Sequence, residues 1–138
     1  MSRNFIILIL SLSLLTPLLC RGTDVPKIDV RQAAQRVEVN KAVLIDVRER
    51  SEWKETGVAA PAVLLSKSDF DGAQEAWKPF LMKHPPSAGI TLILYCRSGR
   101  RAAVVGEALA EMGYAVANAG GFSDWEAAGL PKRQPEEK

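Results

Sequence analysis

The sequence predicts an α/β fold with a mostly parallel central sheet that is flanked by helices on both faces. Apolar stretches typical of buried strands alternate with stretches of helical composition along residues 28–131. Such alternation favours parallel strands joined by crossover helices. The chain has 138 residues, 47% of them apolar and 25% charged, which suits one domain with a hydrophobic core and argues against disorder.

The predicted strands are short apolar runs, placed at residues 28–30, 42–45, 62–65, 90–95 and 114–118. Pro61 puts the third strand at an edge of the sheet or delays its start, because proline donates no ladder hydrogen bond. The helices are predicted at residues 31–39, 49–56, 69–82, 102–112 and 122–128. Gly57, Gly113 and Gly129 end three of these helices. Pro79 is expected to kink the third helix or to begin a new first turn.

The loop after residues 90–95 holds the residues that we expect to be reactive. It holds one thiol, one glycine and three arginines, in the order Cys96-Arg97-Ser98-Gly99-Arg100-Arg101. A loop between a strand and a helix turns backbone N–H groups toward the positive end of the helix dipole and so cradles anions. Such surroundings hold a thiol as the nucleophilic thiolate. The sequence therefore predicts a reactive Cys96 that faces an anionic substrate; the alternative is a buried and inert cysteine.

The N-terminal segment has the pattern of a signal peptide over residues 1–22. Residues 1–4 are polar and basic, and residues 5–19 form an apolar run that is short for a membrane span. Cleavage after Gly22 would leave a domain of residues 23–138. We expect an exported, periplasmic protein, attached to a membrane only if the signal is uncleaved or if Cys20 is lipidated.

Cleavage would also change the charge and the cysteine count. Arg3 and Arg21 would leave, so 16 basic and 16 acidic side chains would remain. A nearly neutral domain offers no basic face, and we expect no nucleic-acid partner. Cys96 would have no second cysteine for a disulfide. One histidine and one cysteine are too few for a metal site, so we expect neither a metal nor an organic cofactor.

Several other polar residues receive structural interpretations. Asp46 and Arg48 follow a predicted strand, at the sheet end where ligands of α/β folds bind. They are either catalytic or, as we expect, a structural ion pair or cap beneath the loop, because charges near a buried turn are usually paired. The charged run at residues 49–52 is expected to be a solvated face, and His84 to be exposed in a loop. The three tryptophans are expected to serve packing: Trp53, Trp77 and Trp125.

Six motifs follow one another along the chain: residues 44–49, Glu52 with Trp53, Gly57, residues 96–101, residues 120–122 with Trp125, and residues 129–131. Together they resemble the single-domain rhodanese family over residues 28–131. The resemblance implies a rhodanese-like fold and sulfurtransferase chemistry through a persulfide on Cys96. It also implies a small anionic donor, thiosulfate, and a thiol acceptor, with cyanide as the acceptor in an assay.

The resemblance assigns roles within the loop. Cys96 is the nucleophile, and the backbone N–H groups of residues 97–101 hold its thiolate and then its persulfide. Gly99 allows the tight turn. Arg100 and Arg101 attract the donor and steady the departing sulfite, while Arg97 does the same or points into solvent. We count Ser98 with this substrate-binding set as part of the same loop.

The sequence departs from the family at three positions. Val58 stands where a histidine is usual, Arg100 where asparagine is frequent, and Ala102 where serine is frequent. The loop is therefore more cationic than usual and lacks one hydroxyl, which leaves local packing and substrate preference open.

Three other functions remain as alternatives. Cysteine phosphatases and arsenate reductases have a similar loop with five residues between cysteine and arginine, whereas four residues separate Cys96 from Arg101 and Ala102 follows. The shorter loop makes a smaller cradle, suited to a persulfide sulfur. The chain could also be a non-catalytic rhodanese-like binding module. A sulfur carrier fed by a protein persulfide or polysulfide would differ only in its acceptor surface.

Overall fold

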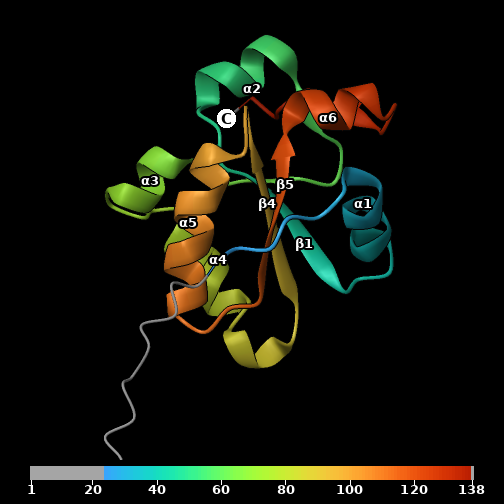
Figure 1. Ribbon diagram of the computed structural model, residues 1–138. Coiled ribbons are helices and arrows are strands. Elements are labelled where there is room, and N and C mark those ends of the chain that lie inside the picture. Colours follow the sequence, from blue (N-terminus) through green and yellow to red (C-terminus); the bar gives the residue numbers. More distant parts are fainter. Residues whose placement is uncertain (1–23, 138) are drawn as a thin grey trace, which may run out of the picture.

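A computed structural model describes residues 24–137 of the chain. The expected signal peptide at residues 1–22, its cleavage after Gly22 and the lipidation of Cys20 lie outside the described residues. Figure 1 shows a central sheet with helices packed on both of its faces. Within residues 24–137, no helix is both long enough and apolar enough to cross a membrane.

The central sheet has four parallel strands in the order β3-β1-β4-β5. Its strands are β1 (Ala42–Asp46), β3 (Val63–Leu64), β4 (Thr91–Cys96) and β5 (Val116–Gly121). A separate antiparallel pair joins β2 (Val58–Ala59) to β6 (Lys132–Arg133). The α/β prediction is confirmed, and β3 lies at an edge of the sheet, in agreement with the proline before it.

Helices cover both faces of the sheet and its carboxyl end. On one face lie α1 (Val30–Glu38) and α6 (Phe122–Ala127); on the other lie α3 (Lys67–Asp71), α4 (Trp77–Lys83) and α5 (Arg100–Glu111). A short helix, α2 (Arg50–Thr56), follows β1 at the carboxyl ends of the strands, and a 3₁₀ turn, η1 (Pro86–Ala88), precedes β4.

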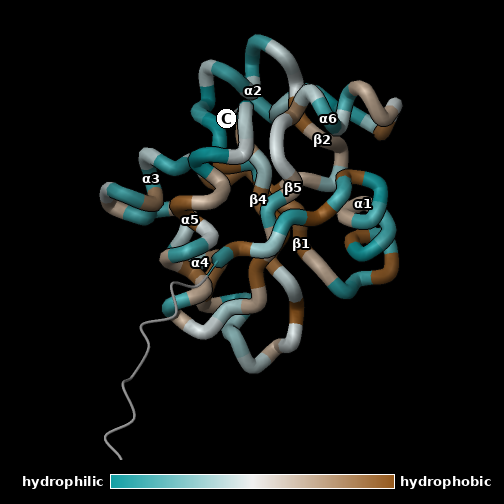
Figure 2. The backbone as a smooth tube through the Cα atoms, viewed as in Figure 1, coloured by the Kyte–Doolittle hydropathy of each residue, from teal (hydrophilic) through white to brown (hydrophobic). Residues whose placement is uncertain are grey.

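The side chains of the central strands alternate between two hydrophobic cores. Leu44 and Ile93 pack toward α1 and α6, whereas Ile45, Leu94 and Cys96 pack toward α4 and α5. Because both faces are covered, both sets of side chains are apolar, which explains the continuous apolar runs in the sequence. Hydrophobic residues accordingly gather along the strands at the centre of the molecule (Figure 2).

The predicted first strand at residues 28–30 was wrong. Lys27 forms only an isolated bridge to Asn118, and α1 already begins at Val30. The Asp29 side chain accepts a hydrogen bond from the backbone N–H of Arg31 at 2.9 Å, so it caps the helix. An aspartate at this position satisfies the free N–H groups of a first helical turn, and this local gain starts the helix early.

The predicted helix at residues 69–82 is in fact two helices, α3 and α4. The chain breaks around Gly72, well before Pro79, and Gln74 adopts a positive φ of 57°. The Asp69 carboxylate accepts hydrogen bonds from three backbone N–H groups in residues 75–77, at 2.8 to 3.2 Å, and so holds the start of α4. Pro79 lies in the first turn of α4, where a missing N–H breaks no helical hydrogen bond.

Two further expectations also need correction. The last strand of the sheet runs over Val116–Gly121 rather than residues 114–118, because Gly121 pairs with Cys96 beyond a register shift. His84 is half-buried rather than exposed. Its ring stacks on Phe80 with the ring centres 4.4 Å apart.

Candidate active site

The carboxyl ends of β1 and β4 bring the predicted site residues to one end of the sheet. In the parallel register, Asp46 at the end of β1 pairs with Tyr95 of β4, and Cys96 is the last residue of β4. Helix α5 begins at Arg100, so residues 97–99 form the loop between strand and helix. The predicted strand–loop–helix arrangement around Cys96 is therefore present.

Cys96 is held by its own loop. Its Sγ accepts a hydrogen bond from the backbone N–H of Gly99 at 3.0 Å. The side chain is only 1% exposed and packs in the core that faces α4 and α5. Burial alone would also fit an inert cysteine. The N–H group aimed at Sγ distinguishes this thiol from an ordinary core residue, because backbone N–H groups of a loop pointed at one atom form an anion-binding arrangement.

Hydrogen bonds join the Cys96 loop to the end of β5. Gly99 has a φ of 89°, and its carbonyl accepts a hydrogen bond from Asn118 Nδ2 at 2.8 Å. The Oδ1 of the same amide accepts the N–H of Gly120 at 2.9 Å. Asn118 is 8% exposed and was missed in the sequence, where it stands in an ordinary strand pattern. It ties the cysteine loop to the next strand.

Gly121 leaves no room for a side chain beneath the loop. A Cβ at this position would lie 2.3 Å from the carbonyl oxygen of Arg97. We expect Gly121→Ala to lower the free energy of unfolding by about 1–3 kcal/mol, the usual range for overpacking, and to displace the loop. Urea unfolding and an assay of Cys96 reactivity measure the two effects.

The matched control is Gly106→Ala in α5. The atoms nearest to a Cβ there belong to the side chain of Val25, the first at 3.0 Å, and a side chain yields more easily than backbone. Equal losses of stability in the two variants would contradict the role assigned to Gly121.

Asp46 and Arg48 form a buried ion pair, as we expect from the sequence. The Arg48 Nη2 to Asp46 Oδ2 distance is 2.7 Å, and the two side chains are 3% and 0% exposed. The Arg48 guanidinium also donates to the carbonyl oxygen of Gly57 at 2.9 Å and to Thr56 Oγ1 at 2.8 Å. It lies 4.3 Å from the centre of the Phe122 ring. The pair thus joins the end of β1 to the end of α2 and the start of α6.

The buried pair changes the protonation of its neighbours. Burial opposes the charge of Arg48, but its hydrogen bond to Asp46 and the negative charge of Asp46 raise its pKa. Burial also raises the pKa of Tyr95, and the charge of Asp46 adds to that effect. The Tyr95 hydroxyl accepts the N–H of Ala59 at 3.1 Å. These groups form a fixed charged platform under the carboxyl ends of the strands.

Glu52 of α2 is bound to Arg101 of the loop. Two hydrogen bonds, at 2.7 and 2.8 Å, join the guanidinium to the carboxylate, and the side chains are 28% and 25% exposed. The same carboxylate accepts the N–H of Glu49 at 2.9 Å, as in a capping box. The expectation that residues 49–52 form a solvated face holds for Arg50 and Ser51, which are exposed, and is wrong for Glu49 and Glu52, which are partly buried. The capping position of Glu52 could be read from the sequence, but its partner across the fold could not.

The arginines of the loop divide into two kinds. The hydrogen bonds with Glu52 raise the pKa of Arg101 against the opposing effect of burial, and the negative charge of Glu52 adds to the increase. Arg97, Ser98 and Arg100 are exposed. Arg97 lines a cavity of about 320 Å³ together with Arg48 and Glu52, whereas Ser98 and Arg100 line a groove on the α1 side of the loop. The structure therefore does not gather the five predicted substrate-binding residues around one cavity.

The Glu52–Arg101 pair predicts a pH-dependent loss of stability. Hydrogen bonds from Arg101, opposed by burial, lower the pKa of Glu52 from 4.5 to about 2. A lowered pKa stabilises the fold fully above the unfolded value, and the gain is lost as the pH falls toward 2. We expect Glu52→Gln to be less stable than wild type at pH 7 and the difference to shrink between pH 4.5 and 2, in urea unfolding followed over this range.

Glu55→Gln is the control on the same helix. Glu55 is exposed and forms no ion pair among residues 24–137. This variant should leave the free energy of unfolding nearly unchanged at pH 7. A Glu52→Gln deficit that stays constant down to pH 2 would show that the ion pair is not its origin.

A match to the rhodanese-like domain family covers residues 29–128 of the chain. This chain belongs to the rhodanese-like family. Within the described residues 24–137, no group of three or more histidine, cysteine, aspartate or glutamate side chains is placed to hold a metal ion. A search of curated proteins gave no match.

Several solved structures are similar to this chain. The polysulfide-sulfur transferase homodimer of Wolinella succinogenes is 25% identical with a TM-score of 0.65, and the match covers 84% of this chain and 83% of that one. The reduced CoADR-RHD protein of Bacillus anthracis is 27% identical with a TM-score of 0.58, but the match covers 73% of this chain and only 16% of that larger one.

A third similar structure carries a different description. It is a protein of unknown function from Rhodopseudomonas palustris, described as a possible tyrosine phosphatase, with 19% identity and a TM-score of 0.59. The match covers 79% of this chain and 85% of that one. At this identity the similarity extends to the fold alone.

Proposed function

We propose that this rhodanese-like protein transfers sulfane sulfur from thiosulfate to a thiophilic acceptor through a persulfide on Cys96. The observation that carries the proposal is the hydrogen bond from the Gly99 N–H to Cys96 Sγ, 3.0 Å long, at the start of the loop. Family membership and the similarity to a polysulfide-sulfur transferase support sulfurtransferase chemistry. The thiosulfate donor is our proposal.

The reaction proceeds in two displacements. The Cys96 thiolate attacks the outer sulfur of thiosulfate, a new S–S bond forms, and the S–S bond of thiosulfate breaks as sulfite leaves with the electron pair. The acceptor then attacks the outer sulfur of the persulfide, and the Cys96 thiolate is restored. With cyanide the product is thiocyanate.

The loop residues supply the electrostatics of both steps. The Gly99 N–H stabilises negative charge on sulfur, and Arg101 places a cation beside it whose position Glu52 fixes. Arg97 and Arg100 are exposed and attract the divalent donor from solvent. The Asp46–Arg48 pair supports the site indirectly, because it holds the ends of β1 and α2 together. In this proposal Glu52 is a positioning residue.

The proposal is tested by intact mass and by product formation. Reduced protein is incubated with thiosulfate alone, and its mass is expected to rise by one sulfur atom. After cyanide is added, thiocyanate should form and the mass should return to that of the reduced protein. Folded, reduced protein that gains no sulfur and forms no thiocyanate would overturn the thiosulfate proposal.

A polysulfide donor is the second candidate. It is favoured by one observation, the 25% identity to the Wolinella succinogenes polysulfide-sulfur transferase over most of both chains. Polysulfide and thiosulfate would load the same Cys96 sulfur. Comparing kcat/KM for the two donors at equal acceptor concentration distinguishes them, because the preferred donor has the larger value.

A further inference from the structure

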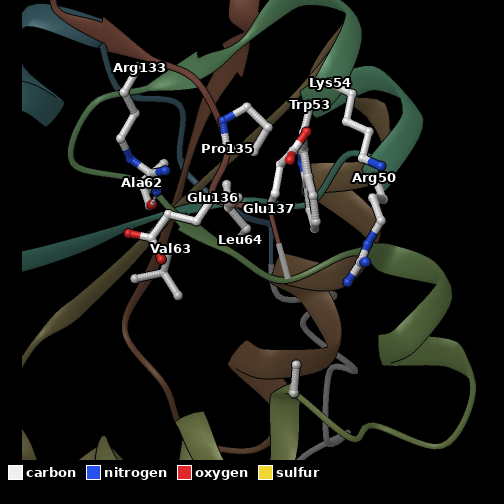
Figure 3. A pocket seen from close by; sticks show the side chains of 11 residues that line it. Arg50, Trp53, Lys54, Ala62, Val63, Leu64, Arg133, Pro135, Glu136 and Glu137 are labelled. Atoms are coloured by element: carbon white, nitrogen blue, oxygen red, sulfur yellow. Dashed lines mark hydrogen bonds between the residues drawn. The ribbon is translucent and has the colours of Figure 1, made fainter.

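A separate cavity of about 730 Å³ lies between α2, the edge strand β3 and the C-terminal segment. Figure 3 shows Arg50, Trp53 and Lys54 on one side of it, and Arg133 with Val63 on the other. No residue of the Cys96 loop lines this cavity. Its volume lies in the range of small-molecule pockets, about 300–1,000 Å³.

The cavity and the Cys96 site use opposite faces of α2. Arg50, Trp53 and Lys54 are spaced by three and four residues, so they share one face of the helix. Glu52, which binds Arg101, is rotated from Arg50 by about 200°. Substitutions on the cavity face therefore leave the Glu52–Arg101 pair in place.

The lining combines an apolar surface with cations. The apolar surface comes from α2, from β3 and the residue before it, and from the C-terminal segment. Its side chains are Trp53, Ala62, Val63, Leu64 and Pro135. Arg50, Lys54 and Arg133 surround it, and none of these three takes part in an ion pair among residues 24–137. The guanidinium of Arg133 is fixed by hydrogen bonds to the carbonyl oxygens of Ala60 and Ala62, at 3.0 and 2.8 Å.

The charges around the cavity favour a ligand that carries one negative charge. Glu136 and Glu137 also line it, so three cations face two carboxylates and one positive charge remains. One negative charge on a ligand would balance it, and a second would meet the two glutamates. The chain's own acidic C-terminal segment also shows that carboxylates are accommodated next to this surface (Figure 3).

Trp53 is positioned to report on the cavity. Its side chain is 7% exposed, and its Nε1 is the one buried side-chain polar atom without a hydrogen-bond partner among the described residues 24–137. Packing alone holds the ring, so it can tilt without breaking a hydrogen bond. The Trp77 and Trp125 Nε1 groups, in contrast, each donate to a backbone carbonyl at 2.9 Å.

We propose that this cavity is a binding site for an amphipathic monocarboxylate, a molecule with one carboxylate and an apolar aliphatic or aromatic body. The apolar body lies against Trp53, Val63 and Leu64, and the carboxylate lies beside Arg50 and Lys54 on the α2 side of the cavity. The site is independent of the sulfur-transfer proposal, because none of its residues belongs to the Cys96 loop.

Sodium decanoate is the probe, and the tryptophan indole N–H signals of ¹⁵N-labelled protein are the readout. The Trp53 signal, assigned by its loss in Trp53→Phe, should shift saturably, whereas the Trp77 signal should not move. Decanamide, which has the same chain without the charge, should bind at least tenfold more weakly. Absence of a saturable Trp53 shift up to millimolar decanoate, or equal binding of decanamide, would overturn the proposal.

Charge variants locate the carboxylate. The double variant Arg50→Ala, Lys54→Ala should weaken decanoate binding at least tenfold, while Lys41→Ala with Lys83→Ala, which removes the same charge away from the cavity, should not. Glu136→Gln with Glu137→Gln should allow the dicarboxylate decanedioate to bind, which wild type should reject. If the Arg50/Lys54 and Lys41/Lys83 double variants weakened decanoate binding equally, the proposed position of the carboxylate would be refuted. Sulfur transfer, measured separately, has no bearing on these outcomes.

Discussion

The Cys96→Ser protein is expected to gain no mass from thiosulfate and to form no thiocyanate above background. A serine hydroxyl does not attack sulfane sulfur as a thiolate does, so both displacements are lost. The oxygen can still accept the Gly99 N–H that now bonds to Sγ at 3.0 Å, and the fold should persist with a change in unfolding free energy of about 1 kcal/mol. Intact mass, thiocyanate formation and urea unfolding measure the three outcomes.

The other cysteine of the sequence supplies the matched control. In the full chain, Cys20→Ser removes a thiol that no step of the proposed reaction uses, and the variant should gain sulfur like wild type. Sulfur loading of Cys96→Ser that disappears only in the double variant would assign the chemistry to Cys20 and refute the persulfide on Cys96.

Asp46→Ala is expected to lower the free energy of unfolding by about 3–5 kcal/mol, the usual cost of removing one partner of a buried ion pair. Arg48 would keep its charge in a site where its side chain is 3% exposed. It would retain the carbonyl of Gly57 and the hydroxyl of Thr56 as acceptors, but neither carries a negative charge. Urea unfolding at pH 7 measures the difference.

Two control variants distinguish the cost of leaving the Arg48 charge buried and unpaired from the cost of removing any carboxylate. Glu126→Ala breaks the exposed pair with Lys132, in which the side chains are 40% and 46% exposed, and should cost about 0–1 kcal/mol. Asp46→Ala combined with Arg48→Met removes both charges and should recover part of the loss. A deficit in Asp46→Ala no larger than that in Glu126→Ala would contradict the structural role of the pair.

Local sequence patterns predicted most of the strands and helices. The apolar runs predicted β1 and β4 nearly residue by residue, and Gly113, with a φ of 93°, follows the end of α5 as expected. Two of the errors arose where a polar side chain accepted hydrogen bonds from backbone N–H groups. Asp29 started α1 in place of a strand, and Asp69 began α4 after a break that the helical composition concealed.

The sequence by itself determined the α/β fold, the loop that carries Cys96 and the neighbouring charges, because these depend on residues close together in the chain. Only the tertiary structure decided which groups meet across the fold: Glu52 with Arg101, and Asn118 with Gly99. Such pairs join residues of separate elements, and their positions follow from how the strands and helices pack. The same packing buries Cys96 and divides the exposed loop arginines between two cavities, which local sequence patterns do not encode.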